Sequence, residues 1–444
     1  MNVLYKCKYL ITIFKNREDD KMKTLKKKGF KSLLQYPEFI KVWMGRLVSR
    51  LGDSIDSIAF MWMIYELTGS PLLMGTIMAV NFLPNVLFGL FSGVFVDRWK
   101  KKPVMISGDL GRGLCVTIIA LLYISGQIEP WHLYIITFLN STFETFASSA
   151  RTAIIPRLIK DEEIYLTTNS LFKATSSLAE IIGLGLAGFI IGIFGIGIAI
   201  LVDAASFFIC TIFILAAKIP ISEKELTKTK LTRKIFNLDL KEGLQTAFKT
   251  PIIRLSILLG VSLNLCISPF NVLAPIYADN VLNGGARAYS FLTLAITIGL
   301  LIGSLIIGQI GNKAGYRNLI IIGISLITSG FMGFYIATSV VIALLAAFLI
   351  GVGAACISSS VVSLIMKETA NEVMGRVSSI MNSLMMAAMP ASTALAGLIA
   401  KFYNTKVIFL TIGISILLIG LIVSVNKSLK DIQYSQKNTP DAVS

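Results

Sequence analysis

The chain has 444 residues, of which 55% are hydrophobic and only 15% are charged, and its mean hydropathy is +0.75. This composition excludes an ordinary soluble domain, in which about 25% of the residues are charged. The net charge of +16 is compatible with nucleic-acid binding. However, the Lys and Arg residues gather in the tail and in alternate loops, which is typical of a topology signal. We therefore expect membrane lipids and no nucleic acid as partners.

Other site classes leave no signature in the sequence. The five cysteines are scattered, and four of them lie in apolar segments, so their spacing fits neither a metal site nor a disulfide framework. No G-x-x-x-x-G-K-[ST] phosphate loop occurs, which argues against an ATP-driven pump. The sequence shows no arrangement of a nucleophile and a base that would indicate an enzyme. We expect no cofactor, no metal and no catalytic residue.

Residues 1–37 form a basic tail that is too short and too interrupted in its apolar part for a signal peptide or a span. Translation starts at Met1 or at Met22, and the sequence leaves both open. Twelve apolar segments follow, each near the ~20 residues that cross a bilayer. They cover residues 39–67, 71–96, 103–125, 131–155, 165–192, 196–217, 252–278, 286–310, 318–337, 340–366, 375–400 and 406–426.

The loops between these segments alternate between short, almost uncharged turns and basic ones. Because positive loops stay in the cytoplasm, both termini are predicted to lie on the cytoplasmic side of the cell membrane. We expect an N-terminal six-helix bundle at 38–217, a cytoplasmic linker at 218–251, a C-terminal six-helix bundle at 252–426 and a cytoplasmic tail at 427–444.

Two stretches of the chain repeat each other at a spacing of 215 residues. GVFVDRWKKK, which begins at Gly93, has a weaker copy in GQIGNKAGYR, which begins at Gly308. Asp97, Arg98 and Lys102 thereby correspond to Asn312, Lys313 and Arg317. Two repeated halves around a central cavity are a transporter architecture. The predicted fold is an all-α membrane protein with 12 transmembrane helices in two six-helix bundles related by a pseudo-twofold axis.

The stretch GVFVDRWKKK resembles the signature loop between helices 2 and 3 of the major facilitator superfamily, and the resemblance covers about residues 38 to 428. Lys100 stands where the family usually has Gly, as in macrolide-efflux and enterobactin-exporter proteins, and GRVSSIMNSLMMAAMP (375–390) also resembles that branch. The resemblance implies a gating loop whose Asp97 faces the start of helix 11 and latches the cytoplasmic side; the alternative is a turn that only sets topology. The gating-loop positions are Gly93, Asp97, Arg98, Lys101, Lys102, Asn312, Lys313 and Arg317.

Charged residues inside the predicted spans are the strongest functional signal. The first half carries eleven: Arg46, Arg50, Asp53, Asp56, Asp109, Arg112, Glu144, Arg151, Lys173, Glu180 and Asp203. Each costs ~2.5–3.5 kcal/mol at the bilayer centre unless it is paired or faces water. They are therefore either proton-coupling groups in a cavity or ion pairs that clamp the helices. We expect coupling or cavity roles for Asp53, Asp56, Glu144 and Glu180, with Asp53 ranked first, and buried ion pairs for Arg50, Asp109, Arg112 and Lys173.

The second half offers amides and large apolar side chains instead of mid-helix charges. Aromatic and Met side chains suit a bulky amphipathic ligand, although packing residues look the same in a sequence. The expected substrate-cavity residues are Trp62, Phe82, Asn264, Phe270, Asn271, Met385 and Met389, with Phe143 and Met386 as further lining residues.

Three functions remain open from the sequence. The first is a monomeric secondary exporter of a bulky amphipathic compound, of the drug, macrolide or siderophore type, driven by inward proton flow. The second is a facilitator or importer of a small nutrient or siderophore. The third is a membrane protein without net transport, such as a sensor.

The alternating basic loops generate a prediction on topology. Single cysteines at Ser222 and Lys228, in the linker, should resist an impermeant thiol reagent in intact cells and react once the membrane is opened. Free labelling of intact cells would contradict the cytoplasmic placement of the linker.

Overall fold

The computed structural model describes residue 33 and residues 35–159, 165–219, 245–246, 248–369 and 374–425. Most of the basic tail, residues 220–244 of the linker and the tail from residue 426 lie outside this part. The side chains of Asp97, Arg98, Asn312 and Lys313 and the surroundings of Gly93 also lie outside it, so the latch remains a prediction.

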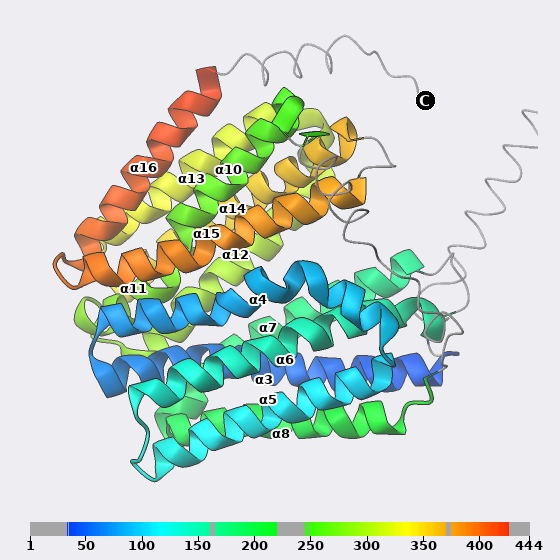
Figure 1. Cartoon of the computed structure of the whole chain (residues 1–444). Helices are drawn as coiled ribbons and strands as arrows, with labels where there is room; N and C mark the ends of the chain where they lie inside the picture. The colour runs from blue at the N-terminus through cyan, green and yellow to red at the C-terminus, as the bar shows by residue number, and fades with distance from the viewer. Residues whose placement is uncertain are drawn as a thin grey trace, which may run out of the picture.

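The first six spans are single long helices that pack as one bundle, coloured blue to green in Figure 1. They are α3 (Pro37–Thr68), α4 (Pro71–Arg98), α5 (Lys101–Ile124), α6 (Pro130–Leu158), α7 (Tyr165–Phe194) and α8 (Ile196–Ala216). Gly69 ends α3 in the left-handed region at φ 55°, and the Ser70 hydroxyl caps α4 by accepting the Leu73 N–H. Local sequence therefore fixes this hairpin turn.

The described residues of the second bundle form seven helices, because its first span is interrupted. They are α10 (Pro251–Ile267), α11 (Phe270–Asn280), α12 (Gly285–Ala314), α13 (Tyr316–Ile336), α14 (Val340–Glu368), α15 (Met374–Ala400) and α16 (Thr405–Val425). The interruption falls at Pro269, which has no N–H to donate to the helix ladder. Taking α10 and α11 as one span, the described residues form twelve spans, which confirms the predicted fold class with boundaries shifted by only a few residues.

Ten of these spans are long and apolar enough to cross a membrane, judged over the described residues. The two that are not, α3 and α6, are the helices that carry Arg46, Asp53, Glu144 and Arg151. Large apolar side chains point outward all around the molecule, as Ile212, Leu305 and Ile422 do, each more than 60% exposed. A soluble surface rarely exposes so much apolar area, whereas a lipid-facing one does.

The two bundles touch at one end of the molecule, where α3 ends and α4 begins. We call this end the sealed side. Here α4 crosses α15 so closely that a Cβ on Gly75 would lie 2.4 Å from the Thr393 carbonyl oxygen, and one on Gly397 would lie 2.3 Å from that of Pro71. Only glycine permits such a backbone approach.

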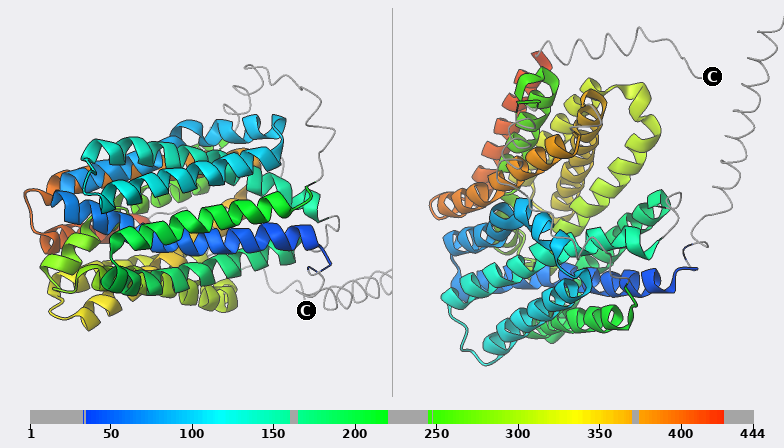
Figure 2. Two further views of the ribbon diagram at one scale, coloured as in Figure 1. Left: turned by 90° about the horizontal axis from the view of Figure 1, so that it is seen from below. Right: turned by 45° about the vertical axis from the view of Figure 1, so that its right-hand side comes forward.

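Further contacts join the bundles at the same side. A Cβ on Gly188 of α7 would lie 3.0 Å from the Arg287 Cα of α12, and the Tyr65 hydroxyl of α3 donates to Asp279 of α11 at 2.9 Å. Toward the opposite end, at which α3 begins and α16 ends, the bundles diverge (Figures 1 and 2). The conformation is therefore closed at the sealed side.

The glycine crossing generates a prediction. Replacing Gly397 by Val should force α4 and α15 apart, because the new side chain would overlap the Pro71 carbonyl oxygen. Spin labels at Gln127 and Asn404, in sealed-side loops of the two bundles, should then report a longer distance. Gly308→Val is the matched control, since a Cβ there meets nothing within 4 Å. Identical distance distributions in both variants would show that this crossing does not hold the sealed side.

Candidate functional site

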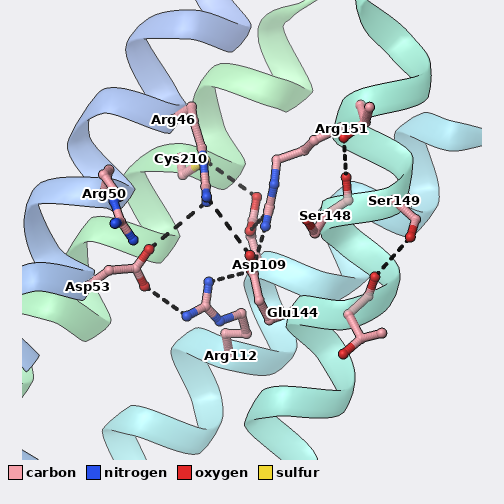
Figure 3. Close-up of polar contacts among 12 residues, drawn as sticks. Arg46, Arg50, Asp53, Asp109, Arg112, Glu144, Ser148, Ser149, Arg151 and Cys210 are labelled. Carbon is pink, nitrogen blue, oxygen red and sulfur yellow. Dashed lines mark hydrogen bonds and ion pairs between the residues drawn. The ribbon is translucent and has the colours of Figure 1, made fainter. Parts of the chain in front are cut away.

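A chain of ion pairs runs through the middle of the first bundle (Figure 3). At its centre, Arg112 of α5 donates to Asp53 of α3 and to Glu144 of α6, both at 2.7 Å. The Arg112 guanidinium also lies 4.2 Å from the centre of the Phe207 ring of α8. One side chain thus joins four helices.

Two further arginines complete this group. Arg151 donates to Asp109 at 2.9 Å and also pairs with Glu144. Arg46 lies farther off, 4.0 Å from Asp53 and 3.9 Å from Glu144. We call these side chains the ion network, which consists of Arg46, Asp53, Asp109, Arg112, Glu144 and Arg151. Three acids and three bases balance in charge, which lowers the cost of holding them within a membrane.

Small residues bring the helices of the ion network close together. A Cβ on Gly108 of α5 would lie 2.5 Å from the Ala147 Cβ of α6, and one on Gly111 would lie 2.7 Å from the Phe143 ring. This approach places Arg112 within reach of Glu144. Phe143 therefore packs between helices, and it is not among the lining residues of the cavities described below.

Two acids beside the ion network form no ion pair within the described part of the chain. Asp203 of α8 is 1% exposed and accepts only the Ser206 hydroxyl, at 3.1 Å, among the contacts of the described residues. It packs against α3 at Gly52, where a Cβ would lie 2.5 Å from its carboxylate. Asp56, one turn beyond Asp53, is half-buried, and no hydrogen bond or ion pair joins its side chain within the described part of the chain. These acids leave a surplus of negative charge.

A separate ion pair joins Arg50 of α3 to Glu180 of α7 at 2.7 Å. Both side chains are about one-third exposed, 35% and 33%, so this pair is partly screened by its surroundings. Lys173 is exposed, and no ion pair to it is found among the described residues. Its prediction as a buried ion-pair residue is wrong, because its side chain is exposed.

A cavity of about 590 Å³ lies between α4 and α6 of the first bundle and α15 of the second. We call it the hydroxyl cavity, because seven of the ten described residues that line it are Ser, Thr or Asn. Those seven are Asn85, Ser92, Thr145, Ser148, Ser149, Asn382 and Ser383, and the rest are Val86, Gly89 and Met386. It lies on the side of the α4–α15 crossing away from the sealed side.

A smaller cavity of about 160 Å³ reaches the ion network from another side. Arg46, Arg151 and Ser148 are among its lining residues. Ser148 also lines the hydroxyl cavity, so one residue of α6 borders both the ion network's cavity and the space shared by the two bundles.

Most of the expected substrate-cavity residues lie elsewhere. Phe270 is only 6% exposed and packs in an aromatic cluster with Phe334 and Phe409, so its cavity assignment is wrong. Asn264 donates to the Gly260 carbonyl of its own helix at 3.0 Å, and Met385 packs over Gly260. The half-buried Phe82, Asn271 and Met389 line none of the cavities described here.

Two other expected lining residues do border cavities. Met386, one position and thus about 100° around the helix from Met385, lines the hydroxyl cavity. Trp62 lines a cavity of about 450 Å³ on the sealed side, together with Glu66, Tyr123 and Arg287.

The described part of the signature loop has a packing role. Lys102 donates to the carbonyls of Leu215 and Ala217, at 2.9 and 2.8 Å, where α8 ends. A cation is favourable at a helix C-terminus, so Lys102 ties the start of α5 to α8. Lys101 is buried and Arg317 is partly buried, and neither position tests the gating role.

The sequence did not assign every member of the site. Arg46, Arg151 and Asp203 stood out only as charges within spans. The spacing of residues along one helix does not tell which neighbouring helix a side chain faces. The hydroxyl residues gave a weaker signal still, the run Ser148-Ser149 in α6 and the polar pair Asn382-Ser383 in α15.

Twelve spans in two bundles, with a polar cavity between the bundles and a charged interior in one of them, define a membrane transporter of the two-bundle type. The family model described as Major Facilitator Superfamily matches residues 42–393, so the chain belongs to that superfamily.

Relatives and solved structures agree with this membership. Macrolide efflux protein A of Streptococcus pyogenes is 25% identical over 399 residues, which cover 87% of this chain and 95% of that protein. The multidrug efflux pump Tap of Mycolicibacterium fortuitum is 24% identical over 402 residues, 88% and 96% of the two chains. The crystal structure of the nucleoside transporter NupG shares the fold, with a TM-score of 0.69 at 13% identity over 91% of this chain and all of that one.

The ion network generates a prediction on stability. Arg112→Met should destabilise the protein by about 3–5 kcal/mol, because it removes the only short ion pair of Asp53 among the described residues and one of the two short ion pairs of Glu144. Arg50→Met removes an equally short but more exposed pair and should cost about 0–1 kcal/mol. Thermal unfolding of purified protein, followed by the loss of monodisperse protein, compares the two. Equal midpoints would mean that the ion network does not hold the bundle together.

Proposed function

We propose that the protein exports a bulky amphipathic compound across the cell membrane and that inward proton flow drives the export. The observation that carries this proposal is the position of Ser148, which borders both the hydroxyl cavity and the cavity that reaches Arg46 and Arg151 of the ion network. A substrate in the hydroxyl cavity and the charged side chains of the ion network can therefore both contact the same helix, α6. The relatives named as efflux proteins support the direction of transport and the kind of compound.

The described conformation suits the loading of substrate. If both termini are cytoplasmic, as the basic loops predict, the sealed side faces the outside and the divergent side faces the cytoplasm. The hydroxyl cavity then lies on the cytoplasmic side of the Gly75–Gly397 crossing. Export requires this crossing to open and the cytoplasmic ends of the bundles to close, which alternates access to the cavity.

The surplus acids are the proposed proton-binding groups. Asp53 and Glu144 each lie 2.7 Å from Arg112, and binding a proton would break a pair that holds the bundle together. Asp56 and Asp203 neutralise no arginine among the described residues. A proton on one of them removes a charge that is costly in the membrane, and its loss restores that charge. We therefore rank Asp56 ahead of Asp53, which the sequence alone placed first.

Coupling would follow from the position of Asp56 on α3. Asp56 lies one turn from Asp53, whose carboxylate binds Arg112. When Asp56 is charged, it competes for the same guanidinium; when it is protonated, Arg112 stays with Asp53 and Glu144. A change in the partners of Arg112 can in this way transmit the protonation of Asp56 on α3 to Glu144 on α6. Two pairings of one buried cation make the kind of two-state element that proton-driven transport needs.

The charge surplus generates a prediction on coupling. Asp56→Asn should still bind substrate but fail to accumulate it against a gradient in inside-out vesicles energised by a proton gradient, because the amide can release no proton. Asp203→Asn tests the second surplus acid in the same way. Glu129→Gln is the control, because this exposed carboxylate just before α6 lies outside the ion network.

The ion-paired acids behave differently under this proposal. Asp53→Asn and Glu144→Gln should lower the amount of folded protein, while the molecules that remain still pump uphill. If Asp56→Asn and Asp203→Asn both accumulate substrate at the wild-type rate per molecule, the proposed proton site is wrong. If the wild-type protein accumulates no tested compound, proton-driven export itself is wrong.

A further inference from the structure

We infer that the hydroxyl cavity selects compounds whose polar part is uncharged and rich in hydroxyl or carbonyl oxygen, such as a glycoside or a polyhydroxylated macrocycle. This inference rests on the proposed export of an amphipathic compound and names its chemical class. The volume of about 590 Å³ lies within the ~300–1,000 Å³ of pockets that hold drug-sized ligands.

The first argument is the supply of unused hydrogen-bonding groups. Ser92 and Ser149 bond to each other at 2.7 Å, and Thr145 donates to the Ser141 carbonyl. The side chains of the other four polar lining residues have no hydrogen-bond partner within the described part of the chain. These are Asn85 of α4, Ser148 of α6, and Asn382 and Ser383 of α15. Two amides and two hydroxyls offer both donors and acceptors, which match hydroxyl, ether and carbonyl oxygens.

The second argument is the absence of charge. Among the described residues, no Asp, Glu, Lys or Arg lines this cavity. The nearest described arginine along α6, Arg151, lies about one turn from Ser148 and is already paired with Asp109 and Glu144. An ammonium or carboxylate group moved from water into this cavity would find no opposite charge, and its desolvation would oppose binding. A neutral group loses less, because the free amides and hydroxyls replace its water.

The third argument is that both bundles contribute. Asn85 belongs to the first bundle and Asn382 to the second, and their helices α4 and α15 cross at Gly75 and Gly397. A compound bound to both amides depends on the present angle between α4 and α15. When the sealed side opens, this angle changes and one set of hydrogen bonds is lost. Met386 and Val86 supply the apolar wall for the rest of an amphipathic molecule.

The test uses the full chain in lipid nanodiscs and three fluorescent probes that share one alkyl tail and one fluorophore. Their head groups are a neutral disaccharide, a quaternary ammonium and a carboxylate. We expect the neutral probe to bind at least tenfold more tightly than either charged probe to the wild-type protein. Equal or tighter binding of a charged probe would overturn the inference, and this comparison needs no variant to fold.

Variants then assign the preference to the cavity. Asn85→Leu and Asn382→Leu should each weaken binding of the neutral probe about tenfold, whereas Gln309→Leu, at an exposed amide of α12 outside the cavity, should not. Asn382→Asp should shift the preference toward the quaternary ammonium probe, because it supplies the missing opposite charge. Wild-type affinity for the neutral probe in both leucine variants would place the binding site elsewhere.

Transport separates this inference from the proposed function. The same probes are offered to proteoliposomes with an imposed proton gradient. Uphill transport of charged probes alone would overturn the inference and leave proton-driven export standing. Binding of the neutral probe with the expected variant pattern, but without uphill transport of any probe, would support the inference and overturn proton-driven export.

Discussion

The rest of the first bundle depends on the pairing of Arg112 with Asp53 and Glu144. A guanidinium is stable within a membrane only beside carboxylates, so the positions of α3, α5 and α6 are linked through one side chain. Gly108 and Gly111 meet this constraint by letting α5 approach α6, and Phe207 covers the cation from α8. The bundle is therefore held by directed contacts, which fix the relative depth of its helices as well as their proximity.

The second bundle is held in a different way. Tyr277, Phe331, Phe334 and Phe409 form a buried aromatic cluster, and the Tyr277 hydroxyl donates to the Phe334 carbonyl at 2.7 Å. Between the bundles, glycines and a few polar contacts make the join at the sealed side. Each bundle thus has its own core, whereas the bundles meet at the sealed side, chiefly through α4 with α15 and α7 with α12. This contrast favours motion of the bundles as rigid bodies about the hydroxyl cavity.

The sequence predicted the fold well because helix boundaries in a membrane follow from local hydropathy, turn residues and basic loops. It predicted the site only in part. The charges themselves were visible, yet the partner of each depends on which helix faces which, and that is set by packing between distant segments. Lys173 and Phe270 show the two resulting errors: a charge that is exposed instead of buried in an ion pair, and an aromatic side chain buried in the core instead of bordering a cavity.

The polarity of α3 and α6 has a consequence for how the protein is made. α3 is synthesised before the other described spans, and it carries Arg46, Arg50, Asp53 and Asp56 before their partners on those later helices exist. Arg46 and Asp53 lie 4.0 Å apart within α3, whereas the short pairs with Arg112 and Glu180 form only after α5 and α7 have been synthesised. Arg50 and Glu180 are 130 residues apart in the sequence, so stable insertion of α3 has to wait for that length of chain. Biogenesis of the first bundle is therefore cooperative. Although α3 is synthesised before α5, α6 and α7, it is among the last helices of this bundle to be stably inserted in the bilayer.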